Sequence, residues 1–409
     1  MRAHTTPLCL SIALSLLSLA APARADKSPA RVNCSAGQSL AAAVANADPN
    51  SIITITGTCA GPIYINTNGL QLKASGGAGI SGGGKDAVTI TGAQRVTLEG
   101  LSITGGSNGV VAQNGAQLLL ENVSVSNNAV SGIVALGASS ITVTGGSSQS
   151  NAVHGLDIEA SSALIVTGKY SVTGNGVFGV NINNGSSLTL TSATLNLLQN
   201  TLGIQLGTNA SGFLDGKSTL VASQNFSDGI TIVSGSHVVD FGGVIQTNSN
   251  AIHGISLNSK AGLDLDAGSQ VTSSSNGGDG VHLQQSSELT IFNNPNFSGN
   301  PTATLLTVAS NKGNGVNALT GSRVLDDNYA AIQSTANALA GLSADDGGSV
   351  AFGQTISVTG VQTLVSGNNP DVRLSFGSRL TYISNDSFGG VTCDATSLIR
   401  GPGAGACPH

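Results

Sequence analysis

A glycine that recurs at a nearly constant spacing is the feature that most restricts how this chain can fold. Ten such glycines are separated by intervals of 23 to 26 residues, apart from one interval of 35 residues. They are Gly109, Gly132, Gly155, Gly179, Gly203, Gly229, Gly254, Gly280, Gly315 and Gly341. A period of this length is typical of repeat proteins in which each unit stacks on the next one.

The residues that follow each glycine alternate between apolar and polar. The first residue after it is Val, Ile or Leu in all ten repeats, and the third is Ala, Ile or Leu in all ten. The residue between them is polar in eight repeats, from Asp157 to Ser343. This period of two indicates a short β-strand with one buried face. No helical period of 3.6 residues and no aromatic propeller signature is present, so the pattern predicts an all-β solenoid.

An asparagine stands four residues before the glycine in eight of the ten repeats. These residues are Asn128, Asn151, Asn175, Asn225, Asn250, Asn276, Asn311 and Asn337. Asparagine tolerates left-handed backbone geometry at turns. When identical asparagines stack on one another, their amides can also form a ladder of hydrogen bonds. We therefore expect an asparagine ladder along one edge of the solenoid.

The N-terminal residues have the features of an export signal. Arg2 precedes an apolar run over residues 8–21, and Ala23-Arg24-Ala25 has the small-x-small pattern of a cleavage site. This pattern predicts a signal peptide over residues 1–25 and an exported protein, periplasmic or extracellular, with no membrane span after cleavage. The remaining chain has 13 basic and 21 acidic residues, a net charge of −8. That charge disfavours a nucleic-acid partner.

Four cysteines remain after cleavage, and they lie in two groups near the two ends. An even number of cysteines in an exported chain predicts disulfides, Cys34 with Cys59 and Cys393 with Cys407. Their spacing fits no zinc pattern, so we expect no metal and no cofactor. Residues 35–45 read as a short amphipathic helix with Ser35 or Ser39 as its N-cap. Such a helix would cover the open end of the solenoid and protect its strand edges.

The repeats, together with the helix and cysteines near the two ends of the chain, resemble the pectin-lyase-like family of right-handed parallel β-helices, over residues 34–385. The resemblance implies a single right-handed β-helix of about thirteen coils, roughly 60 Å long at a strand spacing of ~4.8 Å. It divides the chain into an N-terminal cap over residues 26–50, a parallel β-helix over residues 51–385 and a C-terminal cap segment over residues 386–409.

Stacking brings together residues that occupy the same position in successive coils. The position just before the glycine contains Asp228, His253 and Asp279 in three consecutive repeats. Neighbours in this column should lie about 5 Å apart and the two carboxylates about 10 Å apart. Two exposed carboxylates at ~6.5–9.5 Å suit inverting glycoside hydrolysis. We therefore predict these three as catalytic residues, with His282 and Lys312 as substrate-binding residues beside them.

The long repeat after Asp279 carries an extra segment, Asn293 to Pro301, which we expect to form the wall of a cleft. Locally, residues 227–230 and 252–257 resemble the Asn-x-Asp-Gly and Gly-His-Gly strands of polygalacturonases. Their Asp-Asp pair should lie on a coil between those strands, but here the two coils are adjacent. Their Arg-x-Lys pair has no match on the following coil. Asp-Gly and His-Gly are also ordinary turn sequences, so the column has a purely structural interpretation.

Two functions follow, and they differ in what they predict at this column. The first is a non-catalytic exported β-helix that serves as a surface, envelope or binding rod, because charged and aromatic residues are only 9% and 3% of the chain. The alternative is a carbohydrate-active enzyme of the pectin-lyase-like superfamily, a polysaccharide hydrolase, lyase or epimerase. The partner is a polysaccharide or another component of the cell envelope. An enzyme requires a cleft with both carboxylates exposed, whereas a rod predicts a shallow polar surface.

Overall fold

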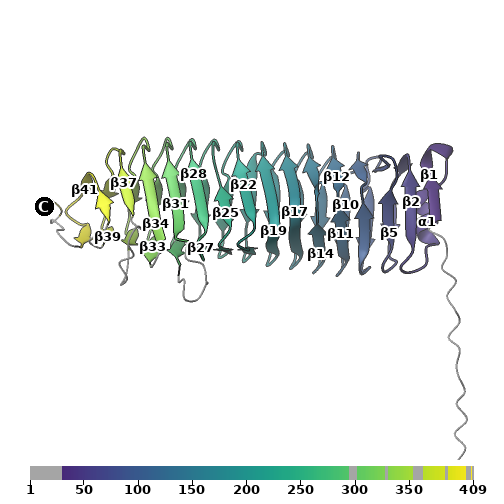
Figure 1. The fold of residues 1–409 in the computed structure, drawn as a ribbon, viewed down its shortest axis with the longest axis horizontal. Helices are drawn as coiled ribbons and strands as arrows, with labels where there is room; N and C mark the ends of the chain where they lie inside the picture. The colour runs from purple at the N-terminus through teal and green to yellow at the C-terminus, as the bar shows by residue number, and fades with distance from the viewer. Residues whose placement is uncertain are drawn as a thin grey trace, which may run out of the picture.

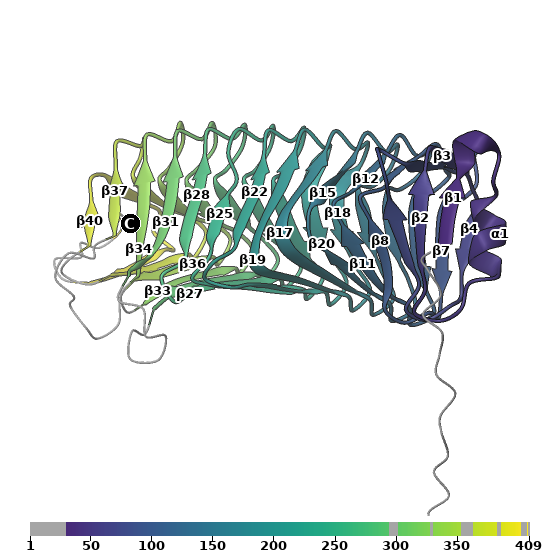
Figure 2. The ribbon, with the colours of Figure 1, turned by 45° about the vertical axis from the view of Figure 1, so that its right-hand side comes forward.

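The computed structural model is a rod of stacked coils, with its first and last described strands at opposite ends (Figure 1). It describes residues 30–293, 302–327, 330–352, 363–382, 386–401 and 407. The predicted signal peptide and most of the extra segment, residues 294–301, lie outside the described residues. Over the described chain, all strand pairings are parallel, and strands of successive coils lie side by side (Figure 2). The predicted all-β solenoid of about thirteen coils is confirmed.

Each coil contributes one strand to a 14-stranded sheet, whose outer face carries the candidate site. The strands of this sheet are β4 (Ile63–Ile65), β7 (Val88–Thr91), β10 (Val110–Gln113), β13 (Ile133–Ala135), β16 (Leu156–Ile158), β18 (Phe178–Ile182), β20 (Leu202–Leu206), β23 (Ile230–Val233), β26 (Ile255–Asn258), β29 (Val281–Leu283), β32 (Val316–Ala318), β35 (Leu342–Ala344), β38 (Val372–Leu374) and β41 (Val391–Cys393).

The described remainder of the coils forms a bent 28-stranded sheet. Its strands are β1 (Ala30–Asn33), β2 (Ile52–Thr56), β3 (Thr58–Ala60), β5 (Gln71–Ala74), β6 (Gly79–Ser81), β8 (Val96–Glu99), β9 (Ser102–Thr104), β11 (Gln117–Glu121), β12 (Val123–Ser126), β14 (Ser140–Val143), β15 (Gly146–Gln149), β17 (Ala163–Thr173), β19 (Ser187–Leu198), β21 (Ser211–Leu214), β22 (Thr219–Ser223), β24 (His237–Phe241), β25 (Val244–Gln246), β27 (Gly262–Asp266), β28 (Gln270–Ser274), β30 (Glu288–Phe292), β31 (Thr304–Ala309), β33 (Arg323–Asp327), β34 (Ala330–Thr335), β36 (Ser349–Phe352), β37 (Leu364–Ser366), β39 (Arg379–Thr381), β40 (Ser387–Phe388) and β42 (Leu398–Arg400).

The repeating glycines stack in register, as the period predicted. The apolar residue after each glycine pairs with the same residue of the next coil, as in Val110 with Ile133 and Ile133 with Leu156. Glycine is needed there because the backbones approach closely. A Cβ on Gly132 would lie 2.7 Å from the side-chain nitrogen of Asn151 and 2.7 Å from the carbonyl oxygen of the next glycine.

The predicted asparagine ladder is present and is longer than the repeat pattern indicated. Each side-chain oxygen accepts two hydrogen bonds from the asparagine of the preceding coil, one from its backbone N–H and one from its amide, as between Asn128 and Asn151. The ladder also includes Asn200 and Asn368, which stand three and not four residues before Gly203 and Asp371, so the fixed spacing missed them. Because these amides are buried, the ladder satisfies polar groups that would otherwise destabilise the edge.

The short helix and the two disulfides that the sequence predicted are present near the ends of the rod. Helix α1 (Leu40–Ala45) begins at Ser39, whose hydroxyl accepts the N–H of Ala42, and it packs on β1, β2 and β4. After β1 comes a short 3₁₀ helix, η1 (Cys34–Ala36). Both predicted disulfides, Cys34–Cys59 and Cys393–Cys407, are present. Disulfides persist in oxidising compartments, which agrees with export.

The C-terminal segment continues the coils further than expected. Strands β40, β41 and β42 still pair with β37, β38 and β39 of the preceding coil, within the segment predicted as a cap. Over the described part of the chain, no helix is long and apolar enough to cross a bilayer.

Candidate active site

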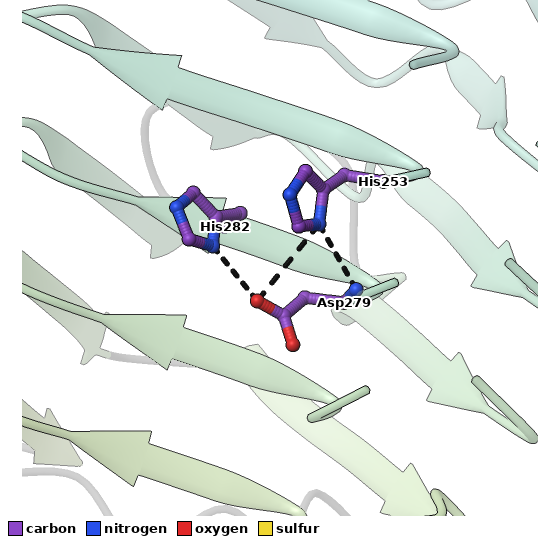
Figure 3. Close-up of side chains that lie close together, drawn as sticks. All are labelled: His253, Asp279 and His282. Carbon is purple, nitrogen blue, oxygen red and sulfur yellow. Dashed lines mark hydrogen bonds and ion pairs between the residues drawn. The ribbon is translucent and has the colours of Figure 1, made fainter. Parts of the chain in front are cut away.

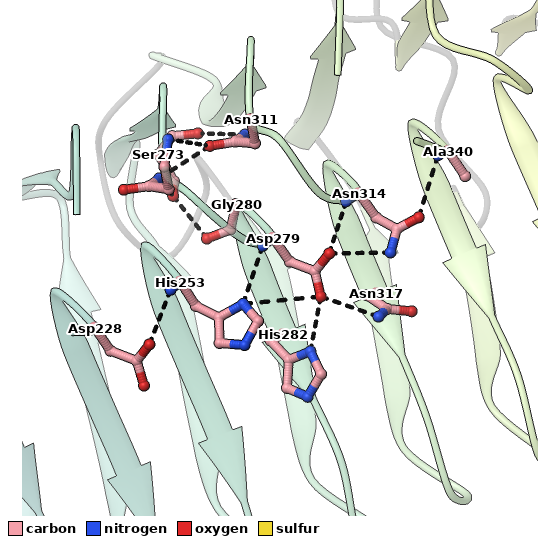
Figure 4. Close-up of polar contacts among 11 residues, drawn as sticks. Asp228, His253, Ser273, Asp279, Gly280, His282, Asn311, Asn314, Asn317 and Ala340 are labelled. Atoms are coloured by element: carbon pink, nitrogen blue, oxygen red, sulfur yellow. Dashed lines mark hydrogen bonds and ion pairs between the residues drawn. The ribbon is translucent and has the colours of Figure 1, made fainter. Parts of the chain in front are cut away.

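The predicted column lies on the turns that lead into the 14-stranded sheet, and its members contact one another (Figure 4). Oδ1 of Asp228 accepts the backbone N–H of His253 at 2.8 Å. Nδ1 of His253 accepts the backbone N–H of Asp279 at 3.0 Å. Oδ1 of Asp279 accepts the backbone N–H of Asn314 at 2.6 Å and its side-chain amide at 3.0 Å. Each side chain of this column therefore holds the backbone of the next coil.

The second oxygen of Asp279 is the centre of the site. Oδ2 lies 2.7 Å from Nδ1 of His282, accepts the amide of Asn317 at 3.0 Å, and lies 3.8 Å from Nδ1 of His253. Burial alone would raise the pKa of Asp279. The hydrogen bonds from His282, Asn317 and Asn314 outweigh it and hold this pKa below its usual range. Asp279 is therefore ionised at neutral pH.

This environment corrects one expectation for the column. An inverting hydrolase needs both carboxylates exposed to the substrate, but the Asp279 side chain is only 7% exposed and both its oxygens accept hydrogen bonds. The other carboxylate, Asp228, is half-buried, and its Oδ2 accepts the hydroxyl of Thr231 at 3.2 Å. The sequence placed these residues in one column, but it did not show that the Asp279 side chain turns inward between two coils.

The two histidines stack on each other and are held in opposite tautomers (Figure 3). Their ring centroids are 4.4 Å apart and the rings are inclined by 20°. A backbone N–H can only donate, so Nδ1 of His253 is unprotonated and the neutral ring carries its hydrogen on Nε2. A carboxylate can only accept, so Nδ1 of His282 carries the hydrogen and Nε2 of the neutral ring has a free lone pair. Asp279 therefore fixes both tautomers, that of His253 through its backbone N–H and that of His282 through its carboxylate.

The outward nitrogens of this pair are accessible. The His253 and His282 side chains are 21% and 14% exposed, and neither Nε2 has a hydrogen-bond partner among the described residues. Burial and the neighbouring charge of His282 lower the pKa of His253, against the opposing charges of Asp228 and Asp279. His253 is therefore a neutral hydrogen-bond donor. Nε2 of His282 is a base whose protonated form the Asp279 carboxylate would stabilise.

The surroundings of the two histidines are polar. On the outer face of the 14-stranded sheet, His282 lies between Ser256 of β26 and Asn317 of β32. Lys312 is exposed on the turn that leads to Asn314, with its backbone N–H bonded to Asn276. Residues 294–301 of the expected cleft wall lie outside the described residues. Their described neighbours follow β30, at a different corner of the coil from the column.

Asn314 and Asn317 were not predicted as site residues. A signal for both existed, because they occupy the positions of Asp279 and His282 one repeat later. Stacking makes residues in the same repeat position neighbours, so the partners of a site can be sought one repeat further along the chain.

The cluster has two histidines and one carboxylate, a set that occurs in metal sites. Ligand atoms of His253, Asp279 and His282 lie within 4.8 Å of one another. In this arrangement, however, Oδ2 of Asp279 and both Nδ1 atoms already take part in hydrogen bonds within the protein. A metal bound through these atoms would have to replace those bonds, whereas Nε2 of each histidine has no partner among the described residues.

A comparison of Asp279 with Asp86 shows which of these hydrogen bonds belong to the fold itself. Asp86 occupies the column position of Asp279 several coils nearer the N-terminus, and Asn108 follows it as Asn314 follows Asp279. Oδ1 of Asp86 accepts the backbone N–H of Asn108 at 3.0 Å and its amide at 2.9 Å. No described residue bonds to its Oδ2. The Oδ1 contacts are thus a device of the fold. Asp228 of the same column has one contact at Oδ2, from Thr231, whereas Oδ2 of Asp279 contacts both His282 and Asn317.

Comparison with known proteins supports the fold. The family described as right-handed β-helix region matches residues 53–202. The matched residues cover part of the parallel β-helix that the structure shows, the fold expected from the resemblance to pectin-lyase-like proteins. The matched residues end before Asp228, so the family match does not include the candidate site. A comparison with curated proteins gives no match.

Several solved structures are similar over most of their length. A periplasmic alginate epimerase is 13% identical, with 91% of this chain and 82% of that chain covered and a TM-score of 0.34. The A-module of a mannuronan C-5 epimerase from Azotobacter vinelandii is 14% identical, with 90% of each chain covered and a TM-score of 0.31. An alginate lyase is 11% identical, with 92% and 86% covered and a TM-score of 0.33. Likenesses at this level say nothing of the activity of this chain.

Proposed function

We propose that this exported chain is a polysaccharide-active enzyme in which His282 removes a proton from a sugar carbon next to a carboxyl group. The observation that carries the proposal is the pair of stacked histidines held in opposite tautomers by one buried aspartate. Such a pair presents a base and a hydrogen-bond donor side by side, which is what proton abstraction requires. This proposal favours the carbohydrate-active alternative over the non-catalytic rod.

In the proposed reaction, Nε2 of His282 takes the proton from C5 of a uronic acid unit. The electron pair of the broken C–H bond moves into the substrate carboxyl group. Asp279 acts as a positioning residue, since it fixes the tautomer of His282 and stabilises the imidazolium that forms. Nε2–H of His253 donates a hydrogen bond to the oxygen on which negative charge develops, and remains neutral throughout. Lys312 is the nearby cation that would face the substrate carboxylate.

Two outcomes are then possible from the same intermediate. If the C4–O bond breaks, a double bond forms between C4 and C5, and the leaving oxygen takes a proton from protonated His282 or from water. If C5 instead takes a proton from a water molecule on the opposite face, and His282 releases its proton to solvent, the sugar is epimerised. Hydrolysis by two carboxylates has less support, because Asp279 is ionised and buried and so cannot serve as the exposed acid.

The test is a panel of polyuronates and neutral polysaccharides offered to the mature chain. Three products are followed: unsaturated uronates by ultraviolet absorbance, epimerised units by NMR, and reducing ends for hydrolysis. Incorporation of deuterium from D₂O into recovered polymer reports proton abstraction even without net change. We expect turnover of a polyuronate, and a loss of about 10²–10⁴-fold in kcat in His282→Gln, the range for removal of a general base.

The matched control is His154→Asn. His154 also stands just before a repeat glycine, but it stacks on Phe178 at 5.0 Å and belongs to no histidine pair. This variant should keep full activity. Asp279→Asn should lose activity and shift the pH profile, because the amide no longer stabilises protonated His282. If no polyuronate is turned over and no deuterium is incorporated, the proposal is wrong. The chain would then be better explained as a surface or binding rod.

A further inference from the structure

A second polar feature lies on the other side of the 14-stranded sheet, where each coil turns into the bent sheet. An open groove of about 390 Å³ lies across β24, β27 and β30. Its lining includes His237, Lys260, Gly262, Asp264, Ser286 and Glu288. The volume is in the range of small-ligand sites, about 300–1,000 Å³. Nothing in the catalytic proposal uses these residues.

The groove exists because a glycine interrupts a row of large side chains. His237 on β24, Gly262 on β27 and Glu288 on β30 are in register on neighbouring strands. A side chain at Gly262 would collide with the imidazole of His237. Its absence lets His237 lie across β27, where Nε2 donates to Oδ2 of Asp264 at 3.0 Å. The imidazole therefore occupies the place that a side chain at Gly262 would take, and it lines the groove on the side opposite Glu288.

The groups around this space alternate in charge. Lys260 is exposed on the turn that leads into β27, and the carboxylate of Glu288 lies 3.7 Å from the guanidinium of Arg323. Ser286 adds a hydroxyl at the rim. Carboxylates accept hydrogen bonds and ammonium or imidazolium groups donate them, so neighbouring hydroxyls of a sugar can be bound in both directions. An aliphatic ligand would leave this set unpaired.

An exposed aromatic ring lies near the groove. Phe213 on β21 is 41% exposed and stands in the same row as Asp264, two strands away, or about 10 Å. Its ring offers apolar contact area beside the polar groups, a combination suited to a pyranose ring with one apolar face.

The groove is close to the candidate active site along the chain. Ser286 follows His282 by four residues on the same coil, a path of at most about 13 Å. Both sites face outward from the same part of the rod. A chain of a few sugar units bound in the groove could therefore reach Nε2 of His282.

We propose that the groove around His237, Gly262 and Glu288 is a sugar-binding subsite that holds one unit of the polysaccharide by its hydroxyls while another unit lies at His282. This inference rests on the proposed function for the identity of the polymer. It does not depend on the chemistry at His282, because binding can be measured without turnover.

The test is calorimetric titration of the full mature chain with di-, tetra- and hexasaccharides of galacturonate and of mannuronate. We expect the affinity to rise with length until an oligosaccharide spans both sites. In Glu288→Gln, this gain should fall about tenfold or more, while binding of the disaccharide to the His282 site is unchanged. Gly262→Ser, which displaces the imidazole of His237 from the wall of the groove, should act in the same way. Glu121→Gln changes a carboxylate of the same sheet far from the groove and serves as the matched control.

The outcomes separate the two proposals. A length-dependent gain that Glu288→Gln removes, without turnover of any substrate, supports the subsite and contradicts the catalytic role of His282. Turnover with equal affinity in the wild type and Glu288→Gln overturns the subsite. If no oligosaccharide binds, the subsite is likewise overturned. The folded state of each variant is checked by its circular dichroism, and Glu288→Gln, on a partly exposed position, keeps the test valid if Gly262→Ser does not fold.

Discussion

The buried carboxyl group of Asp240 should make the stability of this protein depend on pH. Asp240 is 0% exposed and lies in an inward row between Leu214 and Leu265. Its Oδ1 accepts the N–H of Gly243 at 2.8 Å, while its Oδ2 has no partner among the described residues. Burial raises the pKa of Asp240 to about 7, against the hydrogen bond from Gly243 that favours the charged form.

The size and direction of the effect follow from linkage. An unfolded aspartate has a pKa of ~3.9, so between about pH 4 and pH 7 the native protein holds a proton that the unfolded chain has released. The free energy of unfolding therefore falls as the pH rises through this window. Three pKa units correspond to about 4 kcal/mol as an upper bound, at about 1.4 kcal/mol a unit. From pH 5 to pH 8 the loss is about 3 kcal/mol.

Asp240→Asn should remove this dependence, because the amide cannot ionise and its oxygen can still accept the N–H of Gly243. The measurement is urea unfolding of the oxidised mature chain at pH 5, 6, 7 and 8, followed by circular dichroism. The variant should gain stability relative to the wild type as the pH rises. Asp346→Asn, at an exposed turn, should change nothing. A difference between wild type and Asp240→Asn that is the same at pH 5 and pH 8 would refute the reasoning.

Three further predictions concern other parts of the chain. Asn225→Ala interrupts the asparagine ladder and leaves buried groups of Asn200 unpaired, so the thermal midpoint should fall by an amount equivalent to about 2–4 kcal/mol, whereas a substitution at Asn183, outside the ladder, should not have this effect. Gly132→Ala places a Cβ against the ladder and the next coil, and should destabilise the protein by at least about 2 kcal/mol in the same assay. The hydrogen bond to Asp264 raises the pKa of His237, so the stability from this pair is present at low pH and is lost as the pH rises through that pKa; in an NMR titration, Asp264→Asn should lower the pKa of His237.

Much of the fold could be predicted because a solenoid turns a sequence period into spatial neighbours. The glycine spacing predicted the register of the 14-stranded sheet, and the asparagines before it predicted the ladder. The disulfides followed from two pairs of cysteines near the ends. The repeat positions alone were also enough to place Asp228, His253 and Asp279 in one column.

The chemistry of the site could not be read in the same way. The repeat position says which residues are neighbours, but whether a turn side chain points outward depends on the local backbone. The side chain of Asp279 turns inward and so fixes the tautomer of His282, whereas the backbone N–H of Asp279 fixes that of His253. The groove at His237 was missed because it depends on Gly262, a strand glycine outside the repeating position. The only sign of it in the sequence is that His237 and Glu288, which are large, occupy the same position on the two neighbouring strands.

The comparison of Asp279 with Asp86 bears on why the histidines are present at all. Both aspartates hold the next coil through Oδ1, with nearly the same geometry to Asn108 and Asn314. In the coil of Asp86, the positions of His282 and Asn317 are occupied by Thr89 and Val111, and the stacking is undisturbed. The fold therefore does not need the groups that surround Oδ2 of Asp279. Partly burying two imidazoles and an ionised carboxylate opposes folding, since each loses hydration. Other coils stack without these groups, so the arrangement is one that the fold does not require, as expected of a site for proton chemistry at the surface of a rigid β-helix.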